Sequence, residues 1–315
     1  MPSECHSVVR APAMRVTRLD DCGAVVDSSC AMATSESFVD ITLTKVYQER
    51  QDALQLNANG DICVDKPKAP ILRWYEVVVT FCNVDPELLN IVSAEPLVMN
   101  DAVTPVAVGW DSMPDSAESS NFALEFWVGT DDDDCVDGEL TYGYGLLPRV
   151  TQGTIGTITI GNAVVNFTVN AITRGANQWG VGPYNVLINE TGANAGLPGP
   201  LLAPGIPAAA HKRFMWTQLP PPEGVCGCQD LTPIVGVLPL AGAAPLAVVL
   251  TFPLDDDGDP ILPAVIDWDD ASPPETVTSG TTAGHNYALA GTYNATFRPL
   301  EHSSPTYTSA NIVVS

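Results

Sequence analysis

The sequence predicts an all-β protein with two domains. Short runs of Val, Ile, Thr and aromatic residues recur along the 315-residue chain, and such runs are typical of strands. Twenty-seven Pro and 25 Gly residues interrupt these runs, and apolar residues almost nowhere repeat at helical spacing over ten positions. A chain of this length can form two domains that each bury an ordinary core.

The sequence predicts two strands in the first domain with a projecting segment between them. Residues 38–46 alternate between apolar and polar side chains, which predicts a half-buried strand. Residues 73–82 are rich in β-branched and aromatic side chains and are expected to form the best core strand. The stretch between them is polar and contains Asn59-Gly60, a strong tight-turn signal. The sequence therefore predicts a long hairpin or loop that projects from the domain.

One short helix is expected directly after the core strand. Asp85 is a good N-cap, Pro86 suits the first helical position, and the charge of Glu87 favours the positive end of the helix dipole. An apolar face follows, made of Leu88, Leu89, Ile91 and Val92. The helix should have at most about three turns, and it is the only helix that the sequence predicts.

More strands are expected in the second half of this domain. Residues 121–129 form one candidate, and residues 142–150, 154–160 and 164–172 form three more, as an antiparallel meander with Gly-containing turns. Residues 193–210 contain four Pro and three Gly residues, which predicts an exposed loop.

The cysteines favour structural roles. All eight lie in the first 228 residues, and no apolar signal segment precedes them, so we expect synthesis in a cytoplasm. Cys226-Gly-Cys228 is too tight for a zinc knuckle, and no second close Cys or His pair completes a tetrahedral set, so no metal site is expected. Cys63 and Cys82 lie in apolar runs and are expected in the core. The pairs that could oxidise are Cys22 with Cys30, and Cys226 or Cys228 with Cys5 or Cys135.

Charge argues against several classes of binding protein. Thirteen basic and 37 acidic residues give a net charge of −24, which repels phosphate backbones and anionic lipids. Residues 131–134 are four aspartates without the alternating spacing of a calcium loop, so a solvated loop is expected. In residues 255–259, aspartates at alternate positions flank a Gly. A solvated loop is expected there too, with weak calcium binding as the alternative.

The longest uncharged stretch is not expected to cross a membrane. Residues 231–254 are long enough to span a bilayer, but four prolines interrupt them at intervals of six to eight residues. We expect residues 229–244 to form a stiff Pro-rich linker, followed by the first strand of a terminal domain over residues 245–315.

Catalysis has little support in the sequence. The four histidines at positions 6, 211, 285 and 302 belong to no recognisable triad, metal or phosphate-loop pattern. We therefore expect neither enzymatic activity nor a cofactor.

Five motifs in order give residues 14–228 a family resemblance. They are MRVTRLDDCG at 14–23, NANGDIC at 57–63, FCNVDPEL at 81–88, NFALE at 121–125 and, above all, WGVGPYN at 179–185. In order and spacing, this region resembles the major tail (tail tube) proteins of siphophages that infect actinobacteria. Residues 1–13 are then an N-terminal extension.

The resemblance implies a structural role in a virion tail. It implies a barrel-like β-sandwich with a flanking helix, assembled in the host cytoplasm into hexameric rings that stack into the conduit for DNA. Implied partners are further copies, the terminator, tape-measure and distal tail proteins, and genomic DNA that passes without specific binding. The strands over residues 142–172 would contribute to the ring-forming sheet. Residues 47–59 would form the ring-stacking loop, and an N-terminal arm would bridge subunits. The residues implied are Tyr47, Glu49, Arg50 and Asp52 in the loop, and Arg15 and Arg18 in the arm.

The terminal domain has a resemblance of its own. Trp268-Asp, His285-x-Tyr287 and Gly291-x-Tyr293 occur in the order found in the polycystic-kidney-disease (PKD) type of immunoglobulin-like domain, which these residues resemble. The turn at residues 269–272 departs from that family's Gly-Asp-Gly pattern. Trp268 and Tyr293 should fill the core, while His285 and Tyr287 make internal hydrogen bonds. On a tube, this domain would decorate the exterior.

Two other functions stay open. A virion-surface or secreted adhesin built of two β binding modules is the main alternative, and it predicts monomers in solution. A capsid decoration protein is the second, and it predicts co-purification with tailless heads.

Overall fold

The computed structural model confirms the all-β fold class. It describes residues 8–26, 30–50, 53–83, 85–103, 105–130, 141–156, 158, 166–191, 198–199, 205–224, 226–229, 234–238, 241–252, 262–300, 307–309 and 312–315. Most of these residues lie in strands, and only two short helices occur among them. The expected barrel is wrong, because the sheets formed by the described strands are open and none closes on itself.

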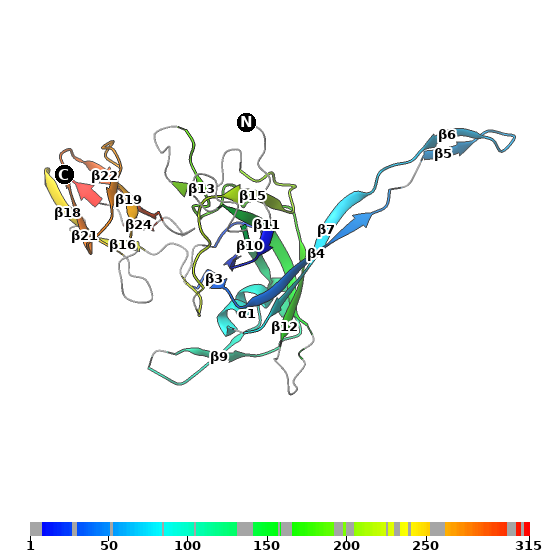
Figure 1. Cartoon of the computed structure of the whole chain (residues 1–315), viewed down its shortest axis with the longest axis horizontal. Helices are drawn as coiled ribbons and strands as arrows, with labels where there is room; N and C mark the ends of the chain where they lie inside the picture. Colours follow the sequence, from blue (N-terminus) through cyan, green and yellow to red (C-terminus); the bar gives the residue numbers. More distant parts are fainter. Residues whose placement is uncertain are drawn as a thin grey trace.

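One large antiparallel sheet organises the first domain (Figure 1). It places the N-terminal strands beside strands from the middle of the chain, since β2 (Met14–Arg18) pairs with β10 (Asn121–Thr130) and β12 (Phe167–Thr173) pairs with β7 (Ile71–Phe81). β1 (Val8–Arg10) also pairs with β10, and β15 (Arg213–Thr217) pairs with β11 (Tyr142–Ile155). The order across the sheet is β3 (Met32–Ser35), β2 (Met14–Arg18), β10 (Asn121–Thr130), β11 (Tyr142–Ile155), β12 (Phe167–Thr173), β7 (Ile71–Phe81) and β4 (Phe38–Gln48).

The predicted helix packs against this sheet. α1 (Pro86–Ser93) begins at the N-cap Asp85, whose side chain accepts a hydrogen bond from the Glu87 amide, and ends at Ala94 in the left-handed conformation. Its four expected apolar residues are buried in the main core with strand residues such as Val16 and Phe122. A second helix, α2 (Ser116–Ser119), is a single turn that the sequence did not predict.

The expected break between two strands of the meander is wrong. β11 runs without interruption past residue 150 to Ile155, and the Gly-containing turn is a β-bulge instead. Gln152 takes a φ of 59° at the bulge. A Cβ on Gly153 would lie 1.7 Å from the Val92 carbonyl oxygen, so glycine lets the strand pass close to α1. Residues 157 and 159–165, which the meander also included, lie outside the described residues.

The Pro/Gly-rich segment is more ordered than the sequence predicted. β14 (Pro198–Gly199) pairs with β13 (Leu187–Ile188), and both residues of β14 are buried. Ile206 is 6% exposed and belongs to a second core cluster with Trp127 and Tyr184. The expected exposed loop is therefore wrong for these residues, because their apolar side chains are buried although the Pro and Gly residues keep the backbone irregular.

Two hairpins leave the body of the molecule. β4 and β7 pair over their whole length and continue away from the body, and β5 (Ala53–Leu56) and β6 (Ile62–Lys66) form the tip (Figure 1). Gly60 turns the tip with a φ of +87°, and its amide donates to the Asn57 carbonyl oxygen at 3.0 Å. This confirms the projecting hairpin. A second hairpin consists of β8 (Leu97–Met99) and β9 (Ala107–Trp110).

The terminal lobe has its own apolar core, which includes Leu250, Ile266, Trp268 and Phe297. The linker expected over residues 229–244 is wrong in part, because β16 (Ile234–Leu238) pairs with β18 (Leu246–Thr251) and β17 (Ala241–Gly242) pairs with β25 (Ile312–Val314). The strands of the lobe are β16 (Ile234–Leu238), β17 (Ala241–Gly242), β18 (Leu246–Thr251), β19 (Ala264–Asp267), β20 (Glu275–Val277), β21 (Thr282–Tyr287), β22 (Gly291–Tyr293), β23 (Thr296–Pro299), β24 (Tyr307–Ser309) and β25 (Ile312–Val314).

The two described helices are also far too short to cross a membrane, and no candidate span is found in the part of the chain that the structure describes.

Candidate functional site

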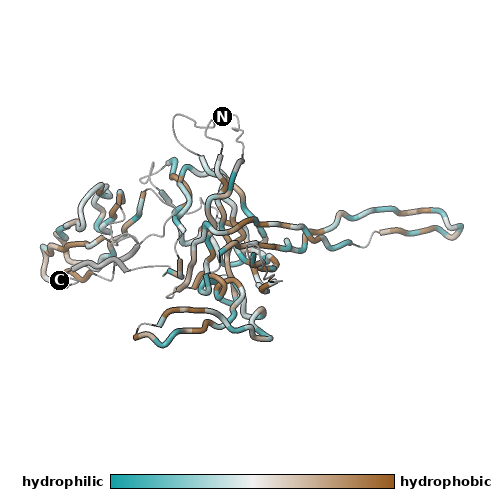
Figure 2. Tube along the Cα trace, turned by 60° about the horizontal axis from the view of Figure 1, so that its bottom comes forward, coloured by the Kyte–Doolittle hydropathy of each residue, from teal (hydrophilic) through white to brown (hydrophobic). Residues whose placement is uncertain are grey.

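The outer part of the β4–β7 hairpin, residues 45–73, exposes large apolar side chains to solvent, and we call it the long hairpin. Leu54 is 59% exposed, Leu56 52% and Ile62 63%. Leu54 and Leu56 are two residues apart on β5 and share a face, and Leu56 pairs directly with Ile62 on β6. Figure 2 shows alternating hydrophobic and hydrophilic segments along this hairpin, far from any other part of the chain. Such a row on a two-stranded ribbon has no folding role within one chain.

The charge of the long hairpin differs from that of the rest of the chain. Residues 45–73 hold five of the 13 basic residues and only four of the 37 acidic ones, a balance of +1. The remaining eight basic and 33 acidic residues give the rest of the chain a balance of −25. A nearly neutral, apolar projection on a strongly acidic body is suited to contact an acidic surface.

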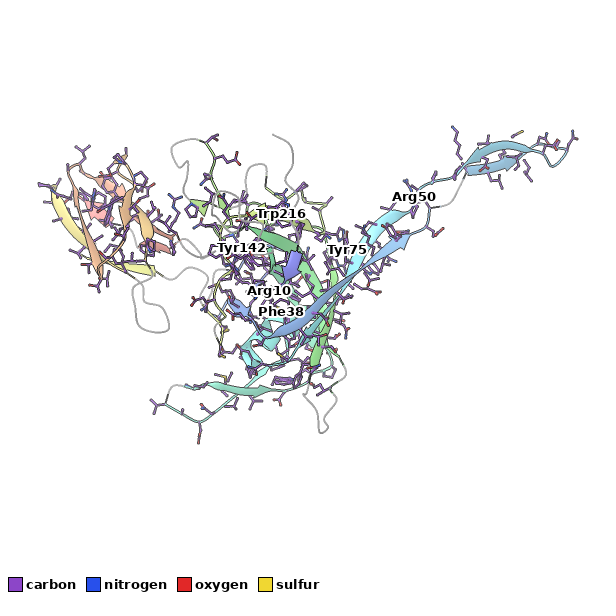
Figure 3. All side chains as sticks on the ribbon, viewed as in Figure 1. Arg10, Phe38, Arg50, Tyr75, Tyr142 and Trp216 are labelled. Atoms are coloured by element: carbon purple, nitrogen blue, oxygen red, sulfur yellow. A yellow bond between two sulfur atoms is a disulfide. The ribbon has the colours of Figure 1, made fainter. Side chains whose placement is uncertain are left out.

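The residues expected in the stacking loop do lie on this projection. Tyr47 is 50% exposed near the end of β4. Glu49 and Arg50 are exposed just beyond it, and Figure 3 shows Arg50 on the hairpin well away from the body. Asp52 lies outside the described residues.

The second hairpin, residues 97–110, is a further apolar surface, which we call the short hairpin. Val98, Met99, Val106 and Val108 are 37%, 47%, 55% and 60% exposed. Its inner face is anchored, because Trp110 packs against the main core and its ring contacts Phe167 edge-on at 6.2 Å. Asp101 is exposed in its turn, and Asp111 is exposed directly after β9. The short hairpin was not predicted from the sequence. The signal was Asn100-Asp101 between two apolar runs, and the Asn100 side chain does accept turn hydrogen bonds from the Ala102 and Val106 amides.

The expected arm contact of Arg15 is wrong. Arg15 is 1% exposed in β2, a central strand, and its guanidinium makes two hydrogen bonds to the Glu125 carboxylate at 2.8 and 2.9 Å. The guanidinium also lies 3.3 Å from the ring centroid of Tyr184, and the Tyr144 hydroxyl donates to Glu125. A side chain held in this way cannot reach a second subunit.

This buried network also shifts pKa values. Burial lowers the pKa of Arg15, but attraction and hydrogen bonding by Glu125 outweigh burial, so that the pKa is raised. The pKa of Tyr144 is raised well above its usual value, first by burial and then by the neighbouring Glu125 carboxylate. Arg15 and Tyr144 therefore keep their protons at neutral pH.

Arg18 is engaged within the chain as well. It is half-buried, and its guanidinium donates to Asn90 Oδ1 of α1 at 2.7 Å. Burial lowers its pKa. This side chain joins β2 to the helix, so a bridge to another subunit is not its role in this structure.

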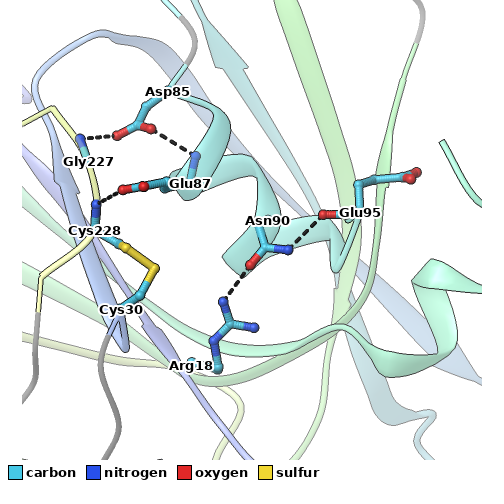
Figure 4. The surroundings of a disulfide bond; sticks show 8 residues. All are labelled: Arg18, Cys30, Asp85, Glu87, Asn90, Glu95, Gly227 and Cys228. Atoms are coloured by element: carbon cyan, nitrogen blue, oxygen red, sulfur yellow. Dashed lines mark hydrogen bonds between the residues drawn. A yellow bond between two sulfur atoms is a disulfide. The ribbon is translucent and has the colours of Figure 1, made fainter. Parts of the chain in front are cut away.

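A disulfide closes the first domain, with a pairing that differs from both expected ones. Cys30 bonds to Cys228, 198 residues away in sequence (Figure 4). Asp85 and Glu87 at the start of α1 accept hydrogen bonds from the Gly227 and Cys228 amides, so the helix positions the segment that carries Cys228.

The remaining described cysteines are Cys22, Cys63, Cys82 and Cys226, and all four are free and exposed. The expectation of Cys63 and Cys82 as core residues is therefore wrong. Cys63 lies on the long hairpin, and Cys82 directly follows β7 at the end of the sheet. Cys5 and Cys135 lie outside the described residues.

Within the described ranges, one residue group could hold a metal ion. Ligand atoms of Cys30, Glu87 and Cys228 lie within 4.8 Å of one another. The two sulfurs are bonded to each other, so neither is a thiolate, the form that binds a metal. The acidic segments at 131–134 and 255–259 lie outside the described residues, as do His6 and His302.

The expected core residues of the terminal lobe come together. Trp268 is 1% exposed, and the Tyr287 hydroxyl donates to its carbonyl oxygen at 2.9 Å. His285 stacks on Trp268 with a centroid distance of 4.7 Å, and its Nε2 lies 2.8 Å from Asp270 Oδ2. Tyr293 stacks on Tyr287 and packs against this core. A Cβ at Gly291 would lie 2.8 Å from the Tyr293 hydroxyl, which explains the glycine there.

Chemically, these features favour assembly. The charged groups of the buried network are satisfied internally, the lobe's histidine belongs to its packing, and the two hairpins place apolar side chains where a second surface can cover them. Searches against protein-family models and against curated proteins find no match to this chain.

Proposed function

We propose that this chain is a structural subunit that polymerises into the tail tube of a phage, as stacked rings, with the terminal lobe on the outside. The observation that carries the proposal is the long hairpin. Leu54, Leu56 and Ile62 form an exposed apolar face on it, and its charge balance of +1 contrasts with −25 for the rest of the chain.

The energetics favour covering this face with protein. Burial of one large aliphatic side chain is worth about 1.5–3 kcal/mol, so three such side chains supply a useful part of the free energy of association. A monomer gains nothing from a two-stranded ribbon extended into water. In a polymer, each copy provides the surface that covers the hairpin of its neighbour, and the contact repeats without limit.

The open sheet supports the same proposal. β3 and β4 are its terminal strands. Gln229 pairs with Met32 at the outer edge of β3, whereas β4 pairs with β7 on one side only, and unpaired strand edges are commonly covered by neighbouring chains. A strongly acidic wall also suits a conduit for DNA, because phosphates are repelled and non-specific binding depends on basic contacts. This repulsion is short-ranged, since charges are screened over roughly 8 Å at physiological salt.

Electron microscopy of the purified full-length chain tests the proposal. We expect rings or hollow striated tubes that become longer as the protein concentration rises. Discrete monomers at high concentration would contradict polymerisation and favour the adhesin of two β modules.

A further inference from the structure

The two hairpins extend in opposite directions. Along the longest axis of the molecule, horizontal in Figures 1 and 2, the long hairpin projects to one side, and the short hairpin runs from its root toward the other. Head-to-tail polymers need two different, mutually complementary surfaces on each subunit. The two hairpins provide two different surfaces, one projecting beyond the body and one along its lower edge in Figure 1.

The chemistry of the two hairpins is complementary as well. The long hairpin carries five basic residues, among them Lys66 and Arg73. Residues 97–115, which include the short hairpin, carry three aspartates and no basic residue. Both hairpins also expose aliphatic side chains, so one contact could bury apolar surface and bring opposite charges together.

The short hairpin has room to receive a side chain. Val98 pairs with Gly109 across the two strands, so no side chain stands opposite it. A Cβ built on Gly109 meets no atom within 4 Å, so this position opens to solvent. Since Trp110 holds the hairpin to the body, the surface around Gly109 stays in place without a partner.

We propose that the short hairpin of one copy is the receiving surface for the long hairpin of the next copy. This inference rests on the proposed function, and it names the partner as a second copy of the same chain. Leu54, Leu56 and Ile62 cover Val98 and Val108, while basic residues of the long hairpin lie near Asp101 and Asp111.

Site-directed cross-linking tests the contact directly. Cys63 is a free, exposed thiol on the long hairpin, so a second thiol introduced by Val108→Cys should be joined to it by a short bismaleimide in assembled protein. We expect a new dimer band on denaturing gels that disappears when Cys63→Ser is added. The matched control is Val249→Cys, which is 47% exposed on the terminal lobe and should give no Cys63-dependent band.

A mixing experiment tests the head-to-tail polarity. One variant carries Leu54→Asp and Leu56→Asp, and the other carries Gly109→Tyr, which places a ring at a position where a Cβ meets no atom of the monomer within 4 Å. Each variant alone should fail to stack, and an equimolar mixture should form pairs of subunits or rings that grow no further, measured by light scattering after size exclusion.

The outcomes separate this inference from the proposed function. If the wild-type chain forms tubes, but Cys63 does not link to position 108 and Gly109→Tyr stacks normally, the receiving surface is overturned and the tube proposal stands. If the wild-type chain does not assemble at all, both are overturned.

Discussion

A guanidinium and a carboxylate lie side by side in the interior of the first domain. Arg15 and Glu125 are each 1% exposed and face each other across β2 and β10. The aromatic rings of Trp127, Tyr144 and Tyr184 surround them. Taking both charges out of water is costly, and two hydrogen bonds plus the tyrosine hydroxyl offset that cost. The pair is therefore sensitive to loss of either partner.

We expect Arg15→Met to lower the free energy of unfolding by about 3–5 kcal/mol, because it leaves Glu125 buried without a counter-charge. Denaturant unfolding measures the change. Arg50→Met, at an exposed arginine on the long hairpin, is the control and should change stability by less than about 0.5 kcal/mol. Equal losses from both substitutions would show that removing Arg15 from the buried pair costs no more stability than removing an exposed arginine.

The Asp270 carboxylate makes the stability of the terminal lobe depend on pH. Burial raises the pKa of Asp270, but hydrogen bonds from Ser272 and His285 outweigh burial and hold the pKa below its usual range. The ionised carboxylate is thus favoured in the folded state. The ionised Asp270 carboxylate stabilises the folded lobe. This stabilisation is complete above the ordinary Asp pKa of about 3.9 and is lost as the pH falls through the lower pKa of the folded state.

Accordingly, Asp270→Asn should unfold at a lower temperature than the wild type at neutral pH, and the difference should shrink as the solution is acidified below about pH 4. Thermal unfolding at several pH values measures this. Val249→Ala, at an exposed position of the lobe without a titrating group, should show no such pH-dependent difference. A difference in unfolding temperature that grows as the pH falls would contradict the lowered pKa of Asp270.

At the scale of elements, α1 is held at its start by two carboxylates that each serve two purposes. Asp85 caps the helix through the Glu87 amide at 2.9 Å and also accepts from the Gly227 amide at 2.6 Å. Glu87 favours the helix dipole and accepts from the Cys228 amide. The same two residues therefore stabilise the helix and the segment that ends the first domain.

Asp85→Ala should cost about 0.5–2 kcal/mol for the lost cap, with a further loss from the contact to Gly227. The chain supplies a matched control, because Asp115 occupies the N-cap of α2 without a side-chain capping bond. Asp115→Ala should leave stability nearly unchanged. Chemical denaturation compares the two, and similar losses would mean that Asp85 does not act as a cap.

This element also shows what the sequence could predict. The cap, the Pro at the first position and the apolar face of α1 are local signals, and the predicted helix is confirmed. The turn at Gly60 and the projecting hairpin were predictable for the same reason. The Cys30–Cys228 pairing depends on how α1 and β3 meet in three dimensions, and no local pattern encodes it. Likewise, Arg15 alternates like a surface residue, and only the position of β2 between β3 and β10 shows that it is buried.

At the scale of the whole molecule, the body and the terminal lobe divide the sequence near Gln229. The Gln229 amide donates to the Met32 carbonyl oxygen, and the Gln229 carbonyl accepts from the Ala31 and Met32 amides, so this residue still belongs to the first domain. Among the described residues, the strands from β16 onward pair with one another and with no strand of the first domain. Both hairpins proposed for assembly lie on the first domain.

A chain truncated after Gln229 should therefore still assemble into tubes, with a smaller outer diameter in electron micrographs. A full-length chain in which residues 50–69 are replaced by a two-residue Asn-Gly turn should remain folded and fail to stack. Loss of assembly on truncation would show that the terminal lobe is needed for polymerisation.

The disulfide has a mechanical consequence. A tension applied to the terminal lobe enters the first domain at Gln229 and reaches Cys228 one residue later. It then crosses the sulfur–sulfur bond to Cys30, two residues before the start of β3. The bond joins the two ends of a stretch of 197 residues, so the load enters the sheet at β3 without passing along the backbone of that stretch. Force on the lobe thus enters the large sheet through a covalent link and β3, and it reaches β7 and β4 only through the intervening strands of that sheet.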